Sequence, residues 1–193
     1  MATITTEHEQ SLRDLVRSIH DGLDLPDGFR AEIVGGDITV AASPFGIHAY
    51  IVSRIRQAVD QALGPEVIVF ENTTLEEPEI DRYIPDLAAW PVALMRDAVD
   101  EWIFPASECA FAVEVTSPKQ EARDYTKAEG YSRGGVPVFL LVNRKTRKCI
   151  VYTDPTPKGY EAQCIVPFGT PVILTFTGKD GEPSTATIDT SDF

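Results

Sequence analysis

Long apolar runs and paired cysteines are both absent from this sequence of 193 residues. No apolar run approaches the ~20 residues needed to span a bilayer. The first twenty residues are polar and include early acids, so they lack the basic start and apolar segment of a secretory signal. Cys109, Cys149 and Cys164 stand far apart and are odd in number, which argues against a disulfide framework and against a cysteine-based zinc site. These absences favour a cytoplasmic protein with no membrane partner.

The short motifs of several enzyme classes are also missing. The sequence contains no G-x-x-x-x-G-K-[ST] phosphate loop, no G-x-G-x-x-G dinucleotide motif and no H-E-x-x-H zinc motif. With 43% hydrophobic and 24% charged residues, the composition is typical of a folded globular protein. The length and the absence of a linker predict a single domain over residues 1–193.

Positive charge is scarce overall but concentrated in one segment. The 17 Lys and Arg residues against 30 Asp and Glu residues give a net charge of -13, which argues against binding to nucleic acid. From Lys119 to Lys148, however, eight basic residues accompany three acidic ones, a local charge of +5. A solvated helix face followed by a charged turn is the alternative explanation. The choice between a nucleic-acid-binding segment and a solvated surface depends on the buried carboxylates discussed below.

Apolar residues at helical spacing predict two helices in the N-terminal third. The first covers residues 12–23, and the second runs over residues 47–63 and stops at Gly64. Between them, RAEIV and DITVAA flank Gly35 and Gly36, a pair suited to the positive backbone angles of a tight hairpin.

Strand-like segments dominate the rest of the chain. The first three are EVIVFEN, YIPDLAAW and ECAFAVEVTS, with a loop and a short helix between the last two. A third helix is expected over residues 121–133, followed by VPVFLLVN and KCIVYTD paired around RKTRK, and by further strands in the tail. Because VPVFLLV is apolar without alternation, it predicts a central strand covered on both faces. The fold class is α/β or α+β, with a mixed central β-sheet flanked by α-helices.

A carboxylate lies inside one of the apolar strands. In FAVEVTS the side chain of Glu114 points to the face opposite Phe111 and Val113, and an ionised carboxylate on a covered sheet needs a partner. Asp86 in IPDLAAW poses the same problem, and Pro85 before it disturbs strand pairing. If the two strands are neighbours, both acids face one cleft.

Two such acids predict a site for a hard cation. Asp86 and Glu114, with the backbone carbonyl of Val115, offer oxygen ligands suited to Mg²⁺ or Mn²⁺.

The third helix adds a polar stripe to this prediction. Gln120, Asp124, Lys127 and Tyr131 lie within about 60° of one another around it. Lys127 is then expected to stabilise charge at the cation site, Asp124 to hold its ammonium group, and Tyr131 to pack with its hydroxyl on a cleft partner. For each residue alone, a turn, a rim charge or a weak surface pair is the competing explanation.

The order of these segments resembles a known family. IPDLAAW, then FAVEVTSP, then D-x-x-K-x-x-x-Y on a helix, then GVPVFLLVNR, is similar to the Uma-two family of endonucleases within the PD-(D/E)xK superfamily. The resemblance extends to RAEIVGGDITVAASP, followed by a helix near His48, and covers most of the chain.

The resemblance implies a restriction-endonuclease-like core and Mg²⁺-dependent hydrolysis of phosphodiesters. Asp86 and Glu114 match the metal-binding acids, while Glu32 and His48 match polar positions in the N-terminal half. The superfamily lysine stands two residues after the Glu, where this chain has Thr116. The family pattern therefore implies that Lys127 has taken its place. A hairpin charge at Glu32 and a helix-start or core role for His48 are equally open.

Three hypotheses follow for the function. The first is a metal-dependent endonuclease acting on DNA, with Lys119 and Arg123 guiding the nucleic-acid backbone. The second is a binding or regulatory module that retains the nuclease fold without turnover, which the net acidity favours. The third is a hydrolase of a smaller phosphorylated ligand. The sequence leaves a homodimer open.

Overall fold

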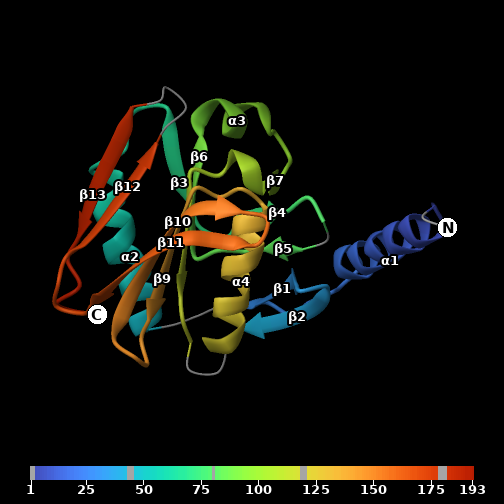
Figure 1. Cartoon of the computed structure of the whole chain (residues 1–193), viewed down its shortest axis with the longest axis horizontal. Coiled ribbons are helices and arrows are strands. Elements are labelled where there is room, and N and C mark those ends of the chain that lie inside the picture. Colours follow the sequence, from blue (N-terminus) through green and yellow to red (C-terminus); the bar gives the residue numbers. More distant parts are fainter. Residues whose placement is uncertain (1–2, 43–45, 80, 118–120, 178–181) are drawn as a thin grey trace.

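The computed structural model describes residues 3–42, 46–79, 81–117, 121–177 and 182–193. The strands of its largest sheet are β3 (Val67–Phe70), β6 (Leu87–Pro91), β8 (Phe111–Val115), β9 (Val138–Asn143), β10 (Lys148–Thr156) and β11 (Gly159–Pro167). They are ordered β11-β10-β9-β8-β6-β3 (Figure 1). The β8–β9 pair is parallel and the other pairs are antiparallel, so the predicted mixed sheet is confirmed.

A second sheet lies beside the first and was not anticipated from the sequence. Its strands are β1 (Phe29–Val34), β2 (Asp37–Ala42), β4 (Thr74–Glu76), β5 (Arg82–Tyr83) and β7 (Ile103–Pro105), in the order β2-β1-β5-β4-β7. The hairpin expected at Gly35 and Gly36 is confirmed, since both glycines have positive φ, 60° and 81°. A further hairpin joins β12 (Val172–Thr177) to β13 (Pro183–Ile188).

The segment YIPDLAAW, expected to be one strand, is divided between the two sheets. Tyr83 ends β5 and Leu87 begins β6, with Pro85 at the junction. Proline has no N–H to donate to a strand partner, and the N–H of Ile84 donates instead to the side chain of Glu32, at 2.8 Å. The chain therefore leaves one sheet and enters the other here, and Asp86 follows directly after the break.

The helices are α1 (Thr3–Asp21), α2 (Ile47–Asp60), α3 (Val92–Asp97) and α4 (Glu121–Arg133), with a 3₁₀ turn at Ala106–Glu108. Helix α4 connects the parallel strands β8 and β9, which confirms the predicted crossover. It ends at Gly134 and Gly135, the second of which has a φ of 79°. Among the described residues, no helix is both long and apolar enough to cross a membrane.

The six-stranded sheet is covered on both faces, as VPVFLLV predicted. On one face Phe111 and Val113 of β8 pack in an apolar cluster with Ile51 and Ile55 of α2. On the other face Ala112 packs in a cluster that includes residues of α4. Because side chains alternate along a strand, Glu114 lies on the same face as Ala112, toward α4.

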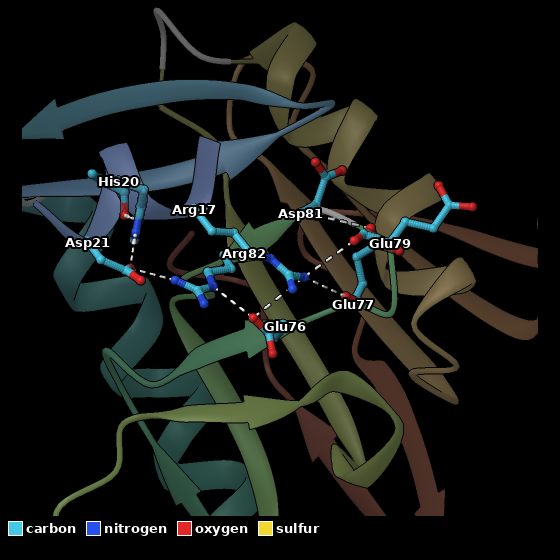
Figure 2. Close-up of polar contacts among 9 residues, drawn as sticks. Arg17, His20, Asp21, Glu76, Glu77, Glu79, Asp81 and Arg82 are labelled. Carbon is cyan, nitrogen blue, oxygen red and sulfur yellow. Dashed lines mark hydrogen bonds and ion pairs between the residues drawn. The ribbon is translucent and has the colours of Figure 1, made fainter. Parts of the chain in front are cut away.

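Helix α1 extends away from the two sheets and is held to them largely by charged side chains (Figures 1 and 2). Arg17 lies 3.5 Å from Glu76, and Arg82 contacts Asp21 at 2.6 Å and Glu76 at 2.9 Å. These four residues are called the anchor cluster below. Among the described side chains of α1, Leu12, Leu15 and Ile19 are exposed, Leu12 by 56%, and Val16 is only partly buried, so ion pairs contribute much of what fixes this helix.

Candidate active site

Strand register places the two predicted metal-binding acids level with each other. In the antiparallel pair of β6 and β8, Leu87 lies opposite Val113, so Asp86, one residue earlier, is level with Glu114. The Oδ2 atom of Asp86 accepts a hydrogen bond from the Val115 N–H at 2.8 Å, which ties the loop before β6 to the end of β8. Both acids are buried. Two carboxylates thus meet where the chain passes between the sheets.

The ammonium group of Lys127 lies between two carboxylates. Its Nζ atom donates to Glu114 Oε1 and to Glu32 Oε1, both at 2.7 Å. The hydroxyl of Tyr131, one turn further along α4, also donates to Glu114 Oε1 at 2.7 Å. Lys127 is only 1% exposed. Lys127 and Tyr131 of the predicted polar stripe therefore face the protein interior, where they contact acids from β1 and β8, while Gln120 lies outside the described residues.

Asp86 has two further partners, His48 and Arg30. His48 Nε2 lies 3.1 Å from Asp86 Oδ2, and the guanidinium of Arg30 lies 3.6 Å from Oδ1. His48 comes from the first turn of α2 and Arg30 from β1. We call Arg30, Glu32, Asp86, Glu114 and Lys127 the site cluster. It draws on β1, β8, α4 and the loop before β6.

Burial raises the pKa of both acids, but the net shift differs between them. For Asp86 burial raises the pKa, but the hydrogen bond and charge of His48 and the charge of Arg30 outweigh it, so the pKa lies below its ordinary value. For Glu114 burial raises the pKa to about 6, because the nearby carboxylates add to burial and the charge of Lys127 only partly offsets them. Glu114 is therefore the acid of the pair that exchanges its proton near neutral pH.

The two cations of the site cluster remain charged. Burial lowers the pKa of Lys127, but the charges of Glu114 and Glu32 raise it above its ordinary value. Burial likewise lowers the pKa of Arg30, and Glu32, Asp86 and Glu114 raise it. With Glu114 ionised, three carboxylates and two cations leave the cluster one negative charge in excess. This excess favours one more cation, and a divalent ion would turn the site positive toward a phosphate.

The donor set fits a hard divalent cation with few protein ligands. Asp86 and Glu114 offer carboxylate oxygens, and both described hydrogen bonds to Glu114 end on Oε1. The backbone carbonyl of Val115, next in the chain, is a third oxygen. Within the described ranges no group of three or more His, Cys, Asp or Glu side chains could hold a metal ion. Mg²⁺ needs only one or two carboxylates because it keeps several waters, so the two acids suffice.

Most of the predicted site residues meet in this region, although their catalytic roles stay predictions. Beyond the acids and Lys127, the structure brings in Glu32, His48 and Tyr131. Asp124 is buried on α4, and its predicted contact with the Lys127 ammonium stays a prediction; the contacts that the structure shows for this ammonium are with Glu32 and Glu114. Lys119 and the side chain of Arg123 lie outside the described residues.

Arg30 was missed by the reasoning from sequence. A signal for it existed, because Arg30 and Glu32 are two residues apart on β1 and therefore point to the same face. What the sequence could not show is that this face turns toward Asp86, 56 positions later in the chain. That contact depends on the pairing of β1 with β5, through Ile33 and Arg82.

One segment matches a serine-hydrolase pattern without its geometry. Residues 130–134 read GYSRG, but they lie in the last turns of α4 and just beyond it rather than at a strand-to-helix turn. The Ser132 hydroxyl donates to the Thr156 carbonyl at 2.8 Å and is buried. This serine therefore ties α4 to β10 and is not an exposed nucleophile.

Comparison with known proteins agrees with the nuclease resemblance. Residues 13–179 match the Uma2 family, whose description reads "Putative restriction endonuclease". A crystal structure described as a "putative nuclease belonging to DUF820", from Anabaena variabilis, aligns with a TM-score of 0.65 and 15% sequence identity. The alignment covers 84% of this chain and 88% of that chain, and at this identity it shows a shared fold. No curated protein matches the chain.

Proposed function

Because the chain belongs to the Uma2 family, we propose that it is a metal-dependent endonuclease that hydrolyses phosphodiester bonds in DNA. The observation that supports this most is the convergence of Asp86, Glu114 and Lys127 from three separate segments into one buried cluster. Burying so many charges costs free energy of folding. Their presence in the interior therefore favours a role other than stability. Such perturbed groups concentrate at functional sites.

The two acids are proposed to hold Mg²⁺ or Mn²⁺, with the carbonyl of Val115 as a third protein ligand. A bound divalent cation supplies a nucleophilic water and neutralises phosphate charge. Asp86 is kept ionised by His48 and Arg30, so it is ready to bind a cation at neutral pH. Glu114 gives up its proton at a pKa of about 6, which the cation would lower further.

Lys127 is proposed to act on the site in two ways. Its hydrogen bonds to Glu114 and Glu32 fix the orientation of both carboxylates, since each bond is 2.7 Å long. Its positive charge, held in a site that excludes water, also offsets negative charge that develops on a phosphate. Tyr131 shares the Glu114 oxygen and adds to this orientation. Lys119 and Arg123 are proposed to guide the DNA backbone.

Cleavage of supercoiled plasmid and of single-stranded DNA at low salt tests this proposal. We expect the wild-type protein to nick DNA with Mg²⁺ or Mn²⁺ and not with EDTA. D86N and E114Q should each lower the initial rate by about 10²-fold or more, the usual effect of removing a group that stabilises transition-state charge. E76Q, in the anchor cluster, is the matched control and should cleave at the wild-type rate. Equal rates for D86N, E114Q and wild type would falsify the assignment.

A module without turnover is the second candidate, and one observation favours it. Lys127 and Arg30 already neutralise two of the three carboxylates of the site cluster, and the whole chain carries a charge of -13 that repels DNA. This candidate predicts that neither Mg²⁺ nor Mn²⁺ raises the unfolding temperature. The nuclease candidate predicts a rise, because a ligand that binds only the folded state stabilises it.

A further inference from the structure

A pocket of about 230 Å³ opens beside Asp86, and Glu114 is not among the residues that line it. Asp86 and Arg30 form part of its wall, and the rest comes from α2 and from the two residues that follow β3. The carboxylates that contact Lys127 do not line this pocket, and neither do the residues of the anchor cluster. Its charged and polar lining residues are Arg30, His48, Arg56, Glu71, Asn72 and Asp86.

Two buried nitrogen atoms on this wall have no hydrogen-bond partner among the described residues. They are Nε of Arg30 and Nδ1 of His48. His48 is 5% exposed, so water does not satisfy this atom from bulk solvent. An unpaired buried polar atom costs free energy, and structures keep such atoms chiefly where a ligand, ion or water completes them. The wall is therefore incomplete in the protein alone.

Arg56 supplies a second guanidinium whose present partners are weak. It lies 3.4 Å from both Asp60 and Glu71, and all three side chains are between 39% and 49% exposed. Exposed pairs of this kind contribute little and exchange readily for a better acceptor. Arg56 and His48 are eight residues apart on α2, about two turns, so they share one side of the helix. The pocket thus has one fixed and one exchangeable arginine.

We propose that this pocket binds a phosphodiester group of a nucleic-acid strand, with Arg30 and Arg56 as its recognition residues. The inference rests on the proposed nuclease function, since it places a phosphate beside the predicted cation site. Guanidinium groups suit phosphate because their planar N–H groups bind two oxygens at once. Arg30 and Arg56 balance Asp86 and Glu71 in the lining, so a cation on Asp86 leaves the pocket positive. Phosphate binding and cation binding should strengthen each other.

Binding of a fluorescent single-stranded oligonucleotide, measured by anisotropy, tests the subsite. Ca²⁺ is used in place of Mg²⁺, and the length of the oligonucleotide is checked by gel afterwards. R56A should bind about fivefold more weakly than wild type, and its plot of log affinity against log salt should be shallower by about 0.7, the value for one phosphate contact on a single strand. R56K should keep the wild-type slope.

Arg54 provides the matched control on the same helix. It is partly buried like Arg56, its guanidinium donates to Gln57 at 2.9 Å, and it does not line the pocket. R54A should therefore bind within about twofold of wild type, as expected for a rim charge. Equal losses in R54A and R56A, or no loss in either, would overturn the subsite because the effect would then be one of general charge.

The subsite and the nuclease proposal fail in different ways. If the wild-type protein binds the oligonucleotide but never cleaves DNA, the nuclease proposal fails, and the difference between R56A and R54A still decides the subsite. If the wild-type protein cleaves DNA and R56A binds as well as wild type, the subsite alone fails. If no oligonucleotide binds with Ca²⁺ present, the subsite is wrong. R30K, which keeps the charge at the buried position, should bind more weakly than wild type since it loses the planar fork.

Discussion

The site cluster and the anchor cluster are built from the same kinds of side chain but differ in burial. In the anchor cluster Asp21 is 53% exposed at its side chain, and burial raises its pKa less than His20 and Arg82 lower it. In the site cluster Glu114 is 3% exposed, and burial outweighs even a direct contact with Lys127. An ion pair that keeps a carboxylate ionised at the surface therefore does not fully offset the cost of burying a carboxylate in the interior.

On the proposed function, this difference separates the structural role of the anchor cluster from the catalytic role of the site cluster. Exposed pairs gain little and cost little, so they can hold α1 in place without affecting the rest of the molecule. Buried charges depend on one another, since the removal of one leaves the others without compensation. Both clusters adjoin a pocket, but the carboxylates of the site cluster are at most 4% exposed, whereas those of the anchor cluster are 32% and 53% exposed. Variants matched between the two clusters measure this contrast.

The largest effect is expected for the removal of one cation from each cluster. K127A leaves Glu114 and Glu32 buried without their shared partner and should lower the free energy of unfolding by about 3–5 kcal/mol. R17A removes a partly exposed pair with Glu76, 24% and 32% exposed at the two side chains, and should cost about 0–1 kcal/mol. Urea unfolding at pH 7 measures both. Similar losses in the two variants would mean that burial does not distinguish the clusters.

Metal binding should stabilise the protein through one cluster only. At a Mn²⁺ concentration 100-fold above its dissociation constant, the free energy of unfolding should rise by about 2.7 kcal/mol. D86N should lose this gain because it removes a charged ligand, whereas E76Q should keep it. Thermal unfolding with and without Mn²⁺ gives the comparison. If Mn²⁺ stabilises D86N as much as wild type, the ion binds at a site that does not include Asp86.

Gly130 lies on α4 between Lys127 of the site cluster and Arg133. Arg133 contacts Asp81, which is close in the chain to Arg82 of the anchor cluster. A Cβ atom at this position would overlap the hydroxyl of Tyr83, whereas one at Gly64 would meet nothing within 4 Å. G130A should therefore lower the free energy of unfolding by about 1–3 kcal/mol through overpacking, and G64A should change it little. Cleavage should also fall in G130A, because α4 carries Lys127. If G130A is as stable as G64A, α4 can shift without cost.

The smallest predicted effect is on the pH dependence of metal affinity. The pKa of Glu114 is raised to about 6, so the acid is about one-tenth ionised at pH 5 and about nine-tenths ionised at pH 7. Because a cation competes with this proton, Mn²⁺ should bind about tenfold more tightly at pH 7 than at pH 5. Titration calorimetry measures the change. An affinity that stays constant over this range would show that Glu114 is not a ligand or is already ionised at pH 5.

Reasoning from sequence predicted the elements of the fold better than their association. The crossover from β8 through α4 to β9 and the hairpin at Gly35 depend on local spacing and turn residues, and both are confirmed. The second sheet was missed because its strands β4, β5 and β7 have two or three residues each, too few to show a period. Likewise Pro85 was expected to disturb a strand, but not to mark the passage between two sheets.

The sequence by itself determined that Glu114 sits in an apolar strand and that Lys127 follows on a helix, because side-chain direction depends only on the local repeat. Tertiary structure alone decided which partners these charges meet. Glu32 reaches Lys127 from 95 positions away, and Arg30 reaches Asp86 from 56 positions away. The physical reason is that the arrangement of the strands follows from burying whole apolar faces, whereas each charge inside that arrangement takes the partners that the packing brings to it.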